Sequence, residues 1–105
     1  MKDLNQFVRK HVLRSISDDY ENFDRILKDV SGWAAEREAS VDHQTALKAL
    51  DELISDGYAQ AYCFSTVPPG GAEEVSYSAD RLDDLWFYVT PRGKRRAHEL
   101  AKEWS

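Results

Sequence analysis

Residues 50–58, Leu-Asp-Glu-Leu-Ile-Ser-Asp-Gly-Tyr, and residues 90–93, Thr-Pro-Arg-Gly, decide the fold that this sequence predicts. The first stretch has the leucine spacing of a helix and ends on Gly57, a residue type that readily takes the left-handed conformation closing a helix. In the second stretch Pro91 follows the capping residue Thr90, at a helix position where the missing N–H costs nothing. A helix therefore ends at the first stretch and another begins at the second.

Between these two stretches the pattern predicts a pair of strands. Residues 58–64 alternate between two sides, with aromatic residues on one side and alanines and Cys63 on the other. Residues 85–89 are aromatic or branched and are expected to pair with them in antiparallel fashion. The segment 65–84 contains Pro68-Pro69-Gly70-Gly71, which cannot continue a strand, so we expect a long loop there.

Apolar residues at helical spacing predict further helices. An N-terminal helix falls within residues 1–16, and a second one is expected from Tyr20 to Arg37, with a kink or break allowed at Gly32. The third helix begins at the N-cap Asp42 and ends at Gly57, so that residues 20–57 form a helix-turn-helix. The last helix covers 91–104. At 105 residues, the whole chain 1–105 is expected to form a single domain.

The charge of the chain is unevenly distributed. The formal net charge is −5, but residues 1–16 and 91–105 each carry +3, which leaves −11 on residues 17–90. A polyanion would be attracted to the two ends and repelled by the middle.

Both quoted stretches resemble the signatures of winged-helix transcriptional regulators, particularly small bacterial ones of the MarR and PadR kind. Leu50, Leu53, Gly57 and Tyr58 match the end of their recognition helix, and residues 89–93 match the motif before their last helix, with Val89 as one conservative change. The resemblance covers about sixty residues. It implies an α+β, mainly helical fold: a winged helix with three N-terminal helices, an antiparallel β-hairpin wing of a two- or three-stranded sheet, and a C-terminal helix.

The resemblance also implies that the first half of the third helix enters the major groove of double-stranded DNA. The candidates for DNA contacts are two sets, one on that helix and one at the start of the last helix: His43, Gln44, Thr45 and Lys48, and Arg92, Lys94, Arg95 and Arg96. Gln44 suits adenine, and Lys48 suits guanine or a phosphate. In the alternative interpretation, the first set is only the solvated face of a core helix.

The predicted wing is acidic, which favours a second hypothesis. Residues 65–84 hold five carboxylates, among them Glu73 and Glu74, and a single cation, Arg81. Such a loop would be repelled by DNA, so the fold would serve protein–protein interaction instead. The cations at the two ends would form one positive surface if the first and last helices lie side by side. Alternatively, they pair with the acidic middle.

No arrangement of residues indicates catalysis, a metal site or a cofactor. The three histidines are far apart in sequence, and Cys63 within a strand suits a buried thiol. We therefore expect a non-enzyme, cytoplasmic by default, with no membrane segment and with a possible homodimer formed through the terminal helices. Aromatic and apolar residues of the second strand and last helix are the interface candidates: Trp86, Tyr88, Leu100 and Trp104.

Overall fold

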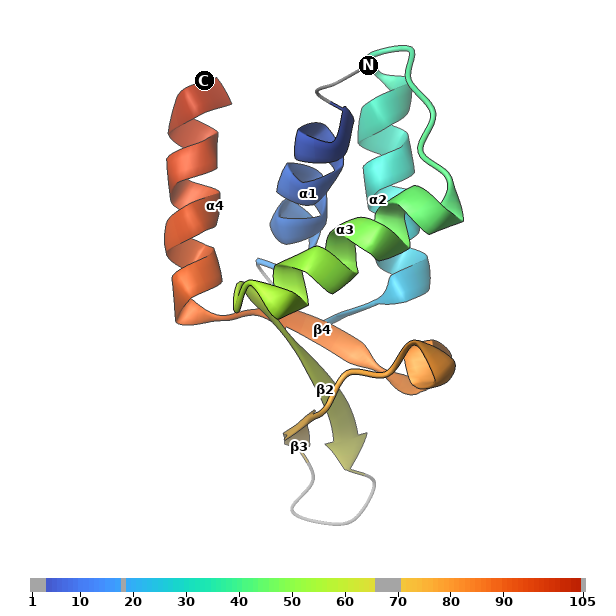
Figure 1. Ribbon diagram of the computed structural model, residues 1–105, viewed down its shortest axis with the longest axis vertical. Coiled ribbons are helices and arrows are strands. Elements are labelled where there is room, and N and C mark those ends of the chain that lie inside the picture. The colour runs from blue at the N-terminus through green and yellow to red at the C-terminus, as the bar shows by residue number, and fades with distance from the viewer. Residues whose placement is uncertain (1–3, 18, 66–70, 105) are drawn as a thin grey trace.

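The helices of the protein gather at one end of the molecule. A computed structural model describes the backbone of residues 4–17, 19–65 and 71–104, and it leaves the side chains of residues 4, 5, 65, 79 and 100–104 undescribed. Within these ranges α1 (Leu4–Ser15), α2 (Phe23–Ala35) and α3 (His43–Ser55) pack together, and α4 (Pro91–Trp104) stands beside α1 (Figure 1). α3 crosses in front of α1 and α2.

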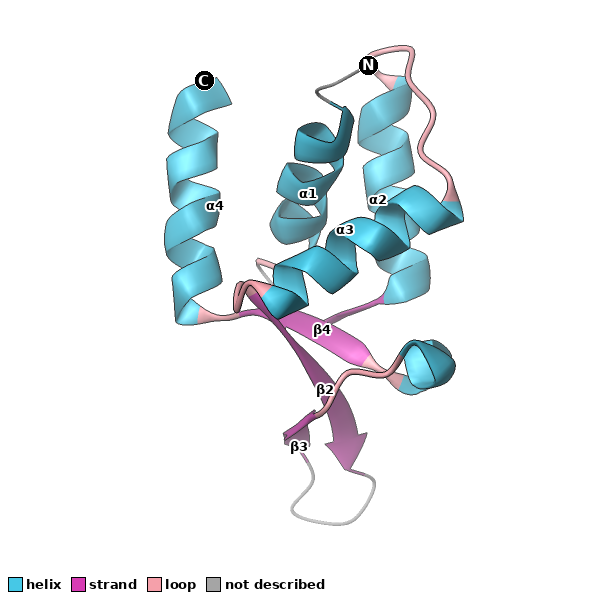
Figure 2. Cartoon of the chain, in the orientation of Figure 1, coloured by secondary structure: helices cyan, strands magenta, loops and turns pink. Residues whose placement is uncertain are grey.

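An antiparallel sheet lies at the lower end of these helices (Figure 2). Its described strands are β1 (Glu21–Asn22), β2 (Ala59–Ser65), β3 (Gly71–Val75) and β4 (Trp86–Val89), in the order β1-β4-β2-β3. β2 pairs with β4 from Ala59 opposite Val89 to Tyr62 opposite Trp86, which confirms the predicted pairing. The β2–β3 hairpin is the wing, and it projects away from the helices (Figure 1).

The core lies between the helices and one face of this sheet. Side chains along a strand alternate between two faces, so Ala59 and Ala61 of β2 share a face with Phe87 and Val89 of β4. All four are buried. They pack with fully buried side chains of the first three helices and of the residue after α1, namely Val8, Val12, Leu13, Ile16, Ile26, Val30 and Leu50. The helices and the sheet therefore share one interior, to which the burial of each larger aliphatic side chain contributes about 1.5–3 kcal/mol.

The end of α3 is fixed by a pair of backbone hydrogen bonds around Gly57, which has a φ of +80°. The Tyr58 N–H donates to the Leu53 carbonyl at 2.9 Å, and the Gly57 N–H donates to the Ile54 carbonyl at 3.1 Å. This is the helix ending that a left-handed glycine makes possible, because it satisfies two carbonyls of the last turn. The chain then turns directly into β2.

Thr90 joins this turn to the start of α4. Its hydroxyl donates to the Gly57 carbonyl at 2.6 Å and accepts from the Gly93 N–H at 3.0 Å, while its own N–H donates to the Tyr58 carbonyl at 3.0 Å. Gly93 is buried against the same turn: a Cβ there would lie 2.0 Å from the Tyr58 oxygen and 2.5 Å from Val89 Cγ2. The two quoted sequence stretches therefore contact each other, and each supplies part of one junction.

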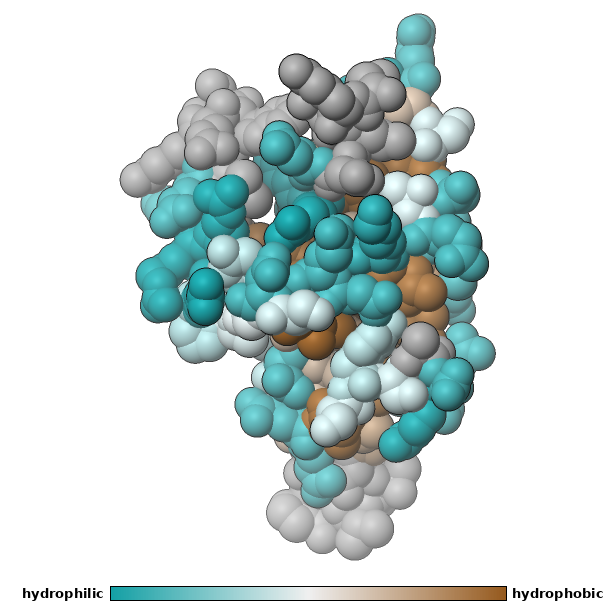
Figure 3. Space-filling view, in the orientation of Figure 1, coloured by the Kyte–Doolittle hydropathy of each residue, from teal (hydrophilic) through white to brown (hydrophobic). Residues whose placement is uncertain are grey.

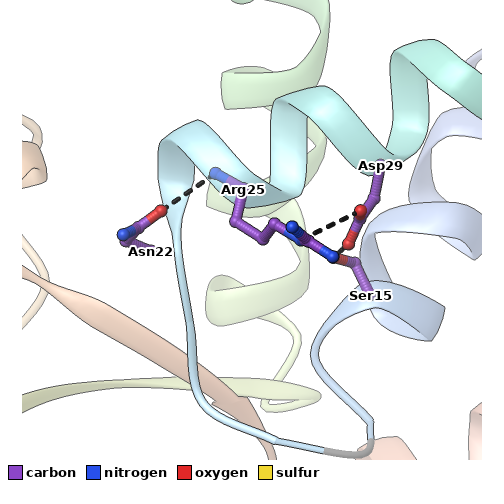
Figure 4. Close-up of polar contacts among 4 residues, drawn as sticks. All are labelled: Ser15, Asn22, Arg25 and Asp29. Atoms are coloured by element: carbon purple, nitrogen blue, oxygen red, sulfur yellow. Dashed lines mark hydrogen bonds and ion pairs between the residues drawn. The ribbon is translucent and has the colours of Figure 1, made fainter.

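The start of α2 differs from the prediction. Tyr20 does not begin the helix; it precedes β1, and α2 starts at Phe23 because the Asn22 side chain accepts from the Arg25 N–H at 2.9 Å (Figure 4). A cap of this kind sets a helix start more sharply than apolar spacing does. Downstream, Asp29 accepts from the Ser15 hydroxyl and pairs with Arg25 at 3.2 Å, which ties α1 to α2. α2 passes through Gly32 unbroken and ends at Ala35, not Arg37.

The predicted loop 65–84 is also partly wrong. Residues 71–75 form β3 on the free edge of β2, and residues 79–84 form a short 3-10 helix, η1 (Ala79–Asp84). Similarly, β1 occupies the free edge of β4, so the sheet has four described strands where two or three were expected. Both additions follow from unpaired strand edges, whose N–H and C=O groups can form hydrogen bonds with an extended segment that reaches them. Pro68, Pro69 and Gly70 lie outside the described residues.

His11 of α1 is a buried polar side chain, only 6% exposed. Its ring lies between Phe7 and Trp33, with centroid distances of 4.2 and 5.1 Å. Burial, followed by the nearby charges of Lys10, Arg14 and Arg37, lowers the pKa of His11 from 6.5 to about 4. The side chain is therefore neutral in the folded protein at neutral pH.

This lowered pKa predicts a loss of stability in mild acid. The pKa of His11 is lower in the folded protein than in the unfolded chain, so the contribution of neutral His11 to stability is fully present at pH values above 6.5. This contribution is lost as the pH falls towards 4, because the unfolded chain then binds a proton that the folded protein does not bind. Urea unfolding at pH 7 and pH 5 measures the change, expected to be about 2 kcal/mol. His11→Phe keeps an aromatic ring between Phe7 and Trp33 but has no group that titrates there. Between pH 7 and pH 5 its free energy of unfolding should therefore fall by about 2 kcal/mol less than that of the wild type. An equal loss in both proteins would contradict the assignment.

Candidate nucleic-acid interface

The first turns of α3 are presented to solvent. Asp42 caps the helix by accepting from the Thr45 N–H at 2.8 Å. Hydrogen bonding by the Thr45 side chain, and then by this N–H, lowers the pKa of the Asp42 carboxyl. His43, Gln44 and Lys48 are exposed, and Thr45 is half-buried. The front of α3 is mostly hydrophilic (Figure 3). The structure thus brings the first set of DNA-contact candidates together on one turn and a half of helix.

His43 is less free than the other three. Its ring packs against Phe23, the first residue of α2, with centroids 4.9 Å apart in an edge-on arrangement. Phe23 itself is buried at 3% exposure. His43 thereby links the starts of α2 and α3, so it has a structural contact in addition to any role in binding.

The acidic residues of the second half of α3 are engaged within the fold. Asp56, the C-cap, pairs with Arg9 of α1 at 2.7 Å. Asp51 lies beside the hydroxyl of Tyr77, in the segment between β3 and η1, and burial together with this carboxylate raises the pKa of Tyr77. The ion pair from Arg9 attaches α1 to the end of α3, whereas Asp51 Oδ1 and the Tyr77 hydroxyl are buried without a hydrogen bond to the described residues.

The wing carries negative charge, as the sequence predicted. Glu73 and Glu74 are exposed on β3, opposite Cys63 and Tyr62 of β2. The exposed carboxylates of η1 add Asp80, Asp83 and Asp84. Arg81 is exposed too, with Nη2 4.0 Å from the sulfur of Cys63. Cys63 is half-buried, where a buried thiol was expected, because its neighbour at this point is the exposed Arg81.

The cations of α4 lie at the other end of α3 from its first turn. Thr90, just before α4, is hydrogen-bonded to the Gly57 carbonyl, so the start of α4 lies next to the end of α3 (Figure 1). Arg92, Lys94 and Arg95 are exposed, and Arg96 is half-buried. Along α3, about 10 Å of helix lies between Lys48, the last member of the first set, and Ser55 at the end next to α4. The structure therefore does not bring them together.

α1 and α4 are in contact, but the cations of α1 do not add an open basic face to those of α4. Arg9 pairs with Asp56, and the Arg14 guanidinium lies 4.2 Å from the ring centre of Trp33. Lys10 is half-buried, and its pKa is lowered by burial and then by Arg37 and Arg14. Part of the predicted pairing between the basic ends and the acidic middle is thus present, in the pair from Arg9 to Asp56.

Aromatic rings cover the face of the sheet that points away from the core. Tyr62 and Trp86 are paired across β2 and β4, and Phe64 packs on Trp86 with centroids 5.2 Å apart. Tyr20 packs on Tyr62, Phe64 and Tyr88 at 4.8 to 5.3 Å. We call this set the aromatic face: Tyr20, Tyr62, Phe64, Trp86 and Tyr88.

The aromatic face remains partly open to solvent. Phe64 is 45% exposed, and the other four rings are half-buried. Sequence reasoning named Trp86 and Tyr88 but missed the remaining three as interface residues. The alternation of residues 58–64, which places Tyr62 and Phe64 on one side, was a signal for these two, whereas Tyr20 was hidden by its assignment to a helix.

Two of the interface candidates, Leu100 and Trp104, lie outside the residues whose side chains are described, so dimerisation through the terminal helices stays a prediction. Among the described residues there is no group of three or more histidine, cysteine, aspartate or glutamate side chains placed to hold a metal ion. No described helix has both the length and the apolar character needed to cross a bilayer.

Comparison with known proteins identifies the fold. No family model and no curated protein sequence matches the chain. Two solved structures are similar: smu.1704 from Streptococcus mutans UA159, with a TM-score of 0.63 and 18% identity over 95% of this chain and 77% of that one, and a PadR-like transcription factor from Bacteroides fragilis, with a TM-score of 0.59 and 14% identity over 98% and 84%. At these identities the likeness establishes the winged-helix fold and nothing finer.

Proposed function

We propose that this protein is a small non-enzymatic transcriptional regulator that binds double-stranded DNA through the first half of α3. The observation that carries the proposal is the exposed turn of Gln44 and Lys48, capped by Asp42 and set on a rigid core. Likeness in fold to a PadR-like transcription factor supports it. Fold alone does not establish function, so the proposal depends on what these side chains bind.

In this proposal α3 lies in the major groove with its first turns against the bases. Gln44 can pair with adenine through its amide, and Lys48 can donate to guanine or to a phosphate. The cations of α4, at least about 10 Å away along α3, would meet the DNA backbone about three or more base pairs from the bases being read. The acidic wing would be held off the duplex, since Glu73 and Glu74 are exposed on it.

Reversing the charge of Lys48 is expected to weaken duplex binding by about tenfold or more, because a base or phosphate contact is lost and a carboxylate is placed at the groove. The matched control is Lys28→Glu, which makes the same change in net charge at an exposed position on α2. Fluorescence anisotropy with a random duplex, titrated with salt from about 50 mM, measures both. Equal weakening in the two variants would show that only net charge matters. Absence of wild-type binding at about 50 mM would remove the DNA proposal.

The aromatic face supports a second candidate function, the binding of a protein partner. Tyrosine and tryptophan are enriched at protein interfaces, and this face presents five partly open rings next to Glu74. A partner-binding module would lose its partner when Trp86 is substituted, and substitution of Lys48 would not change its binding. The duplex titration therefore separates the two candidates, because only a DNA-binding protein should lose affinity on Lys48→Glu.

A further inference from the structure

An open hollow lies where α4 passes the α3–β2 junction. Its volume is about 420 Å³, within the range of small-ligand sites, and it is lined by Tyr58, Arg92, Arg95, Arg96 and Glu99. The four residues from α4 are spaced i, i+3, i+4 and i+7, which places them on one side of the helix. The hollow is thus formed by a single helix face closing over the ring of Tyr58.

The lining of this hollow is strongly positive in a protein whose net charge is −5. Its three guanidinium groups and one carboxylate leave a net charge of +2. Arg96 pairs with Glu99 at 3.2 Å. Across the described side chains, no carboxylate forms an ion pair with Arg92 or Arg95. Among the described side chains, Arg92 and Arg95 therefore lack a carboxylate partner.

The fold does not require this cluster of charge. Like charges at i, i+3 and i, i+4 destabilise a helix, so three arginines on one face carry a cost. Thr90 already caps the start of α4, and Gly93 already supplies the close contact with Tyr58. Arg92 packs on the junction, where its guanidinium carbon lies 5.2 Å from the ring centre of Tyr58. That contact places the Arg92 guanidinium over the junction, on the same helix side as Arg95.

We infer that this hollow is a binding site for a phosphoryl oxyanion. Guanidinium groups bind phosphate in a forked, two-bond geometry, and Arg92 and Arg95 offer unpaired forks one helical turn apart. Arg96 adds a third guanidinium, already shared with Glu99. Lys94 is not part of the site, because its amine lies over Tyr88 on the aromatic face, 5.3 Å from the ring centre. The site does not depend on DNA binding, since a free phosphorylated molecule presents the same phosphoryl oxygens as the DNA backbone.

Pyrophosphate titrated against the full chain tests the site without DNA. The melting temperature should rise with pyrophosphate relative to sodium chloride at equal ionic strength, because a ligand that binds only the folded state stabilises it. In direct titration, Arg92→Gln with Arg95→Gln should weaken binding at least tenfold. The matched control, Lys28→Gln with Arg81→Gln, also removes two exposed cations and should bind as the wild type does. Glu99→Gln should tighten binding, because it removes the only carboxylate of the lining.

Two results would overturn the site: no response of the wild type to pyrophosphate, or an equal response in the two double variants. Arg95→Gln alone guards against misfolding, because Arg95 is exposed and forms no ion pair with the described side chains. A duplex arm then identifies the source of the phosphoryl group. Displacement of duplex by pyrophosphate assigns the site to the DNA backbone, and simultaneous binding assigns it to a free ligand. A chain that binds pyrophosphate but no duplex would end the DNA proposal and keep the site.

Discussion

Gly93→Ala is expected to destabilise the protein by about 3 kcal/mol or more, and so to lower its melting temperature by about 12 °C or more. The new methyl group would lie 2.0 Å from the Tyr58 carbonyl oxygen and 2.5 Å from Val89 Cγ2. The carbonyl cannot move aside, because it also accepts the Thr90 N–H. The start of α4 would have to lift away from β2. Urea or thermal unfolding followed by circular dichroism measures the effect.

Gly32→Ala is the matched control for this substitution. Gly32 lies in the interior of α2, and a Cβ there meets no atom within 4 Å. The same chemical change should therefore stabilise the protein by about 0.5–1 kcal/mol, since alanine is the better helix former. If Gly93→Ala were as harmless as Gly32→Ala, the close contact between α4 and the α3–β2 junction would be wrong.

Phe87→Ala should cost about 3–5 kcal/mol, because it removes a fully buried ring from the centre of the sheet and leaves a cavity. Phe87 lies opposite Ala61 on β2, and its ring meets that of Tyr77 with centroids 6.0 Å apart. Small neighbours such as Ala61 cannot fill the space that the ring leaves. The free energy of unfolding in urea, compared with that of the wild type, measures the loss.

Phe64→Ala removes the same ring from the opposite face of the sheet. Phe64 is 45% exposed and keeps contacts with Tyr20 and Trp86 only at its sides, so the cost should not exceed about 1.5 kcal/mol. A cost equal to that of Phe87→Ala would mean that the aromatic face is covered. The Phe64→Ala variant is expected to stay folded, which makes it suitable for testing partner binding at that face.

Much of the architecture could be predicted from short segments. Asp42 as N-cap, Gly57 as the left-handed ending of α3 and Thr90 before Pro91 are local signals, because each acts on backbone groups within a few residues. The alternation in residues 58–64 and 85–89 likewise predicted two strands and their pairing. That Thr90 also bonds to Gly57 could not be predicted, since 33 residues separate them.

The candidate sites show the same division. The exposed first turn of α3 followed from its cap and its apolar spacing, and Gln44 and Lys48 could be named in advance. The aromatic face could not, because Tyr20 joins it only through the pairing of β1 with β4. The arginine hollow needed the approach of α4 to Tyr58. Sequence also could not tell that Arg9 is paired with Asp56, 47 residues away.

The sequence by itself determined the helices, the two central strands, both ends of α3 and the start of α4, since caps, periodicity and glycine conformation act over a few neighbouring residues. Only the tertiary structure decided which distant groups meet: Gly93 on Tyr58, β1 and β3 on free strand edges, and arginines of α4 around one hollow. Segments such as Gly71–Val75 have little strand preference of their own. They become strands because an unpaired edge lies within reach, and that edge exists only once the chain has folded.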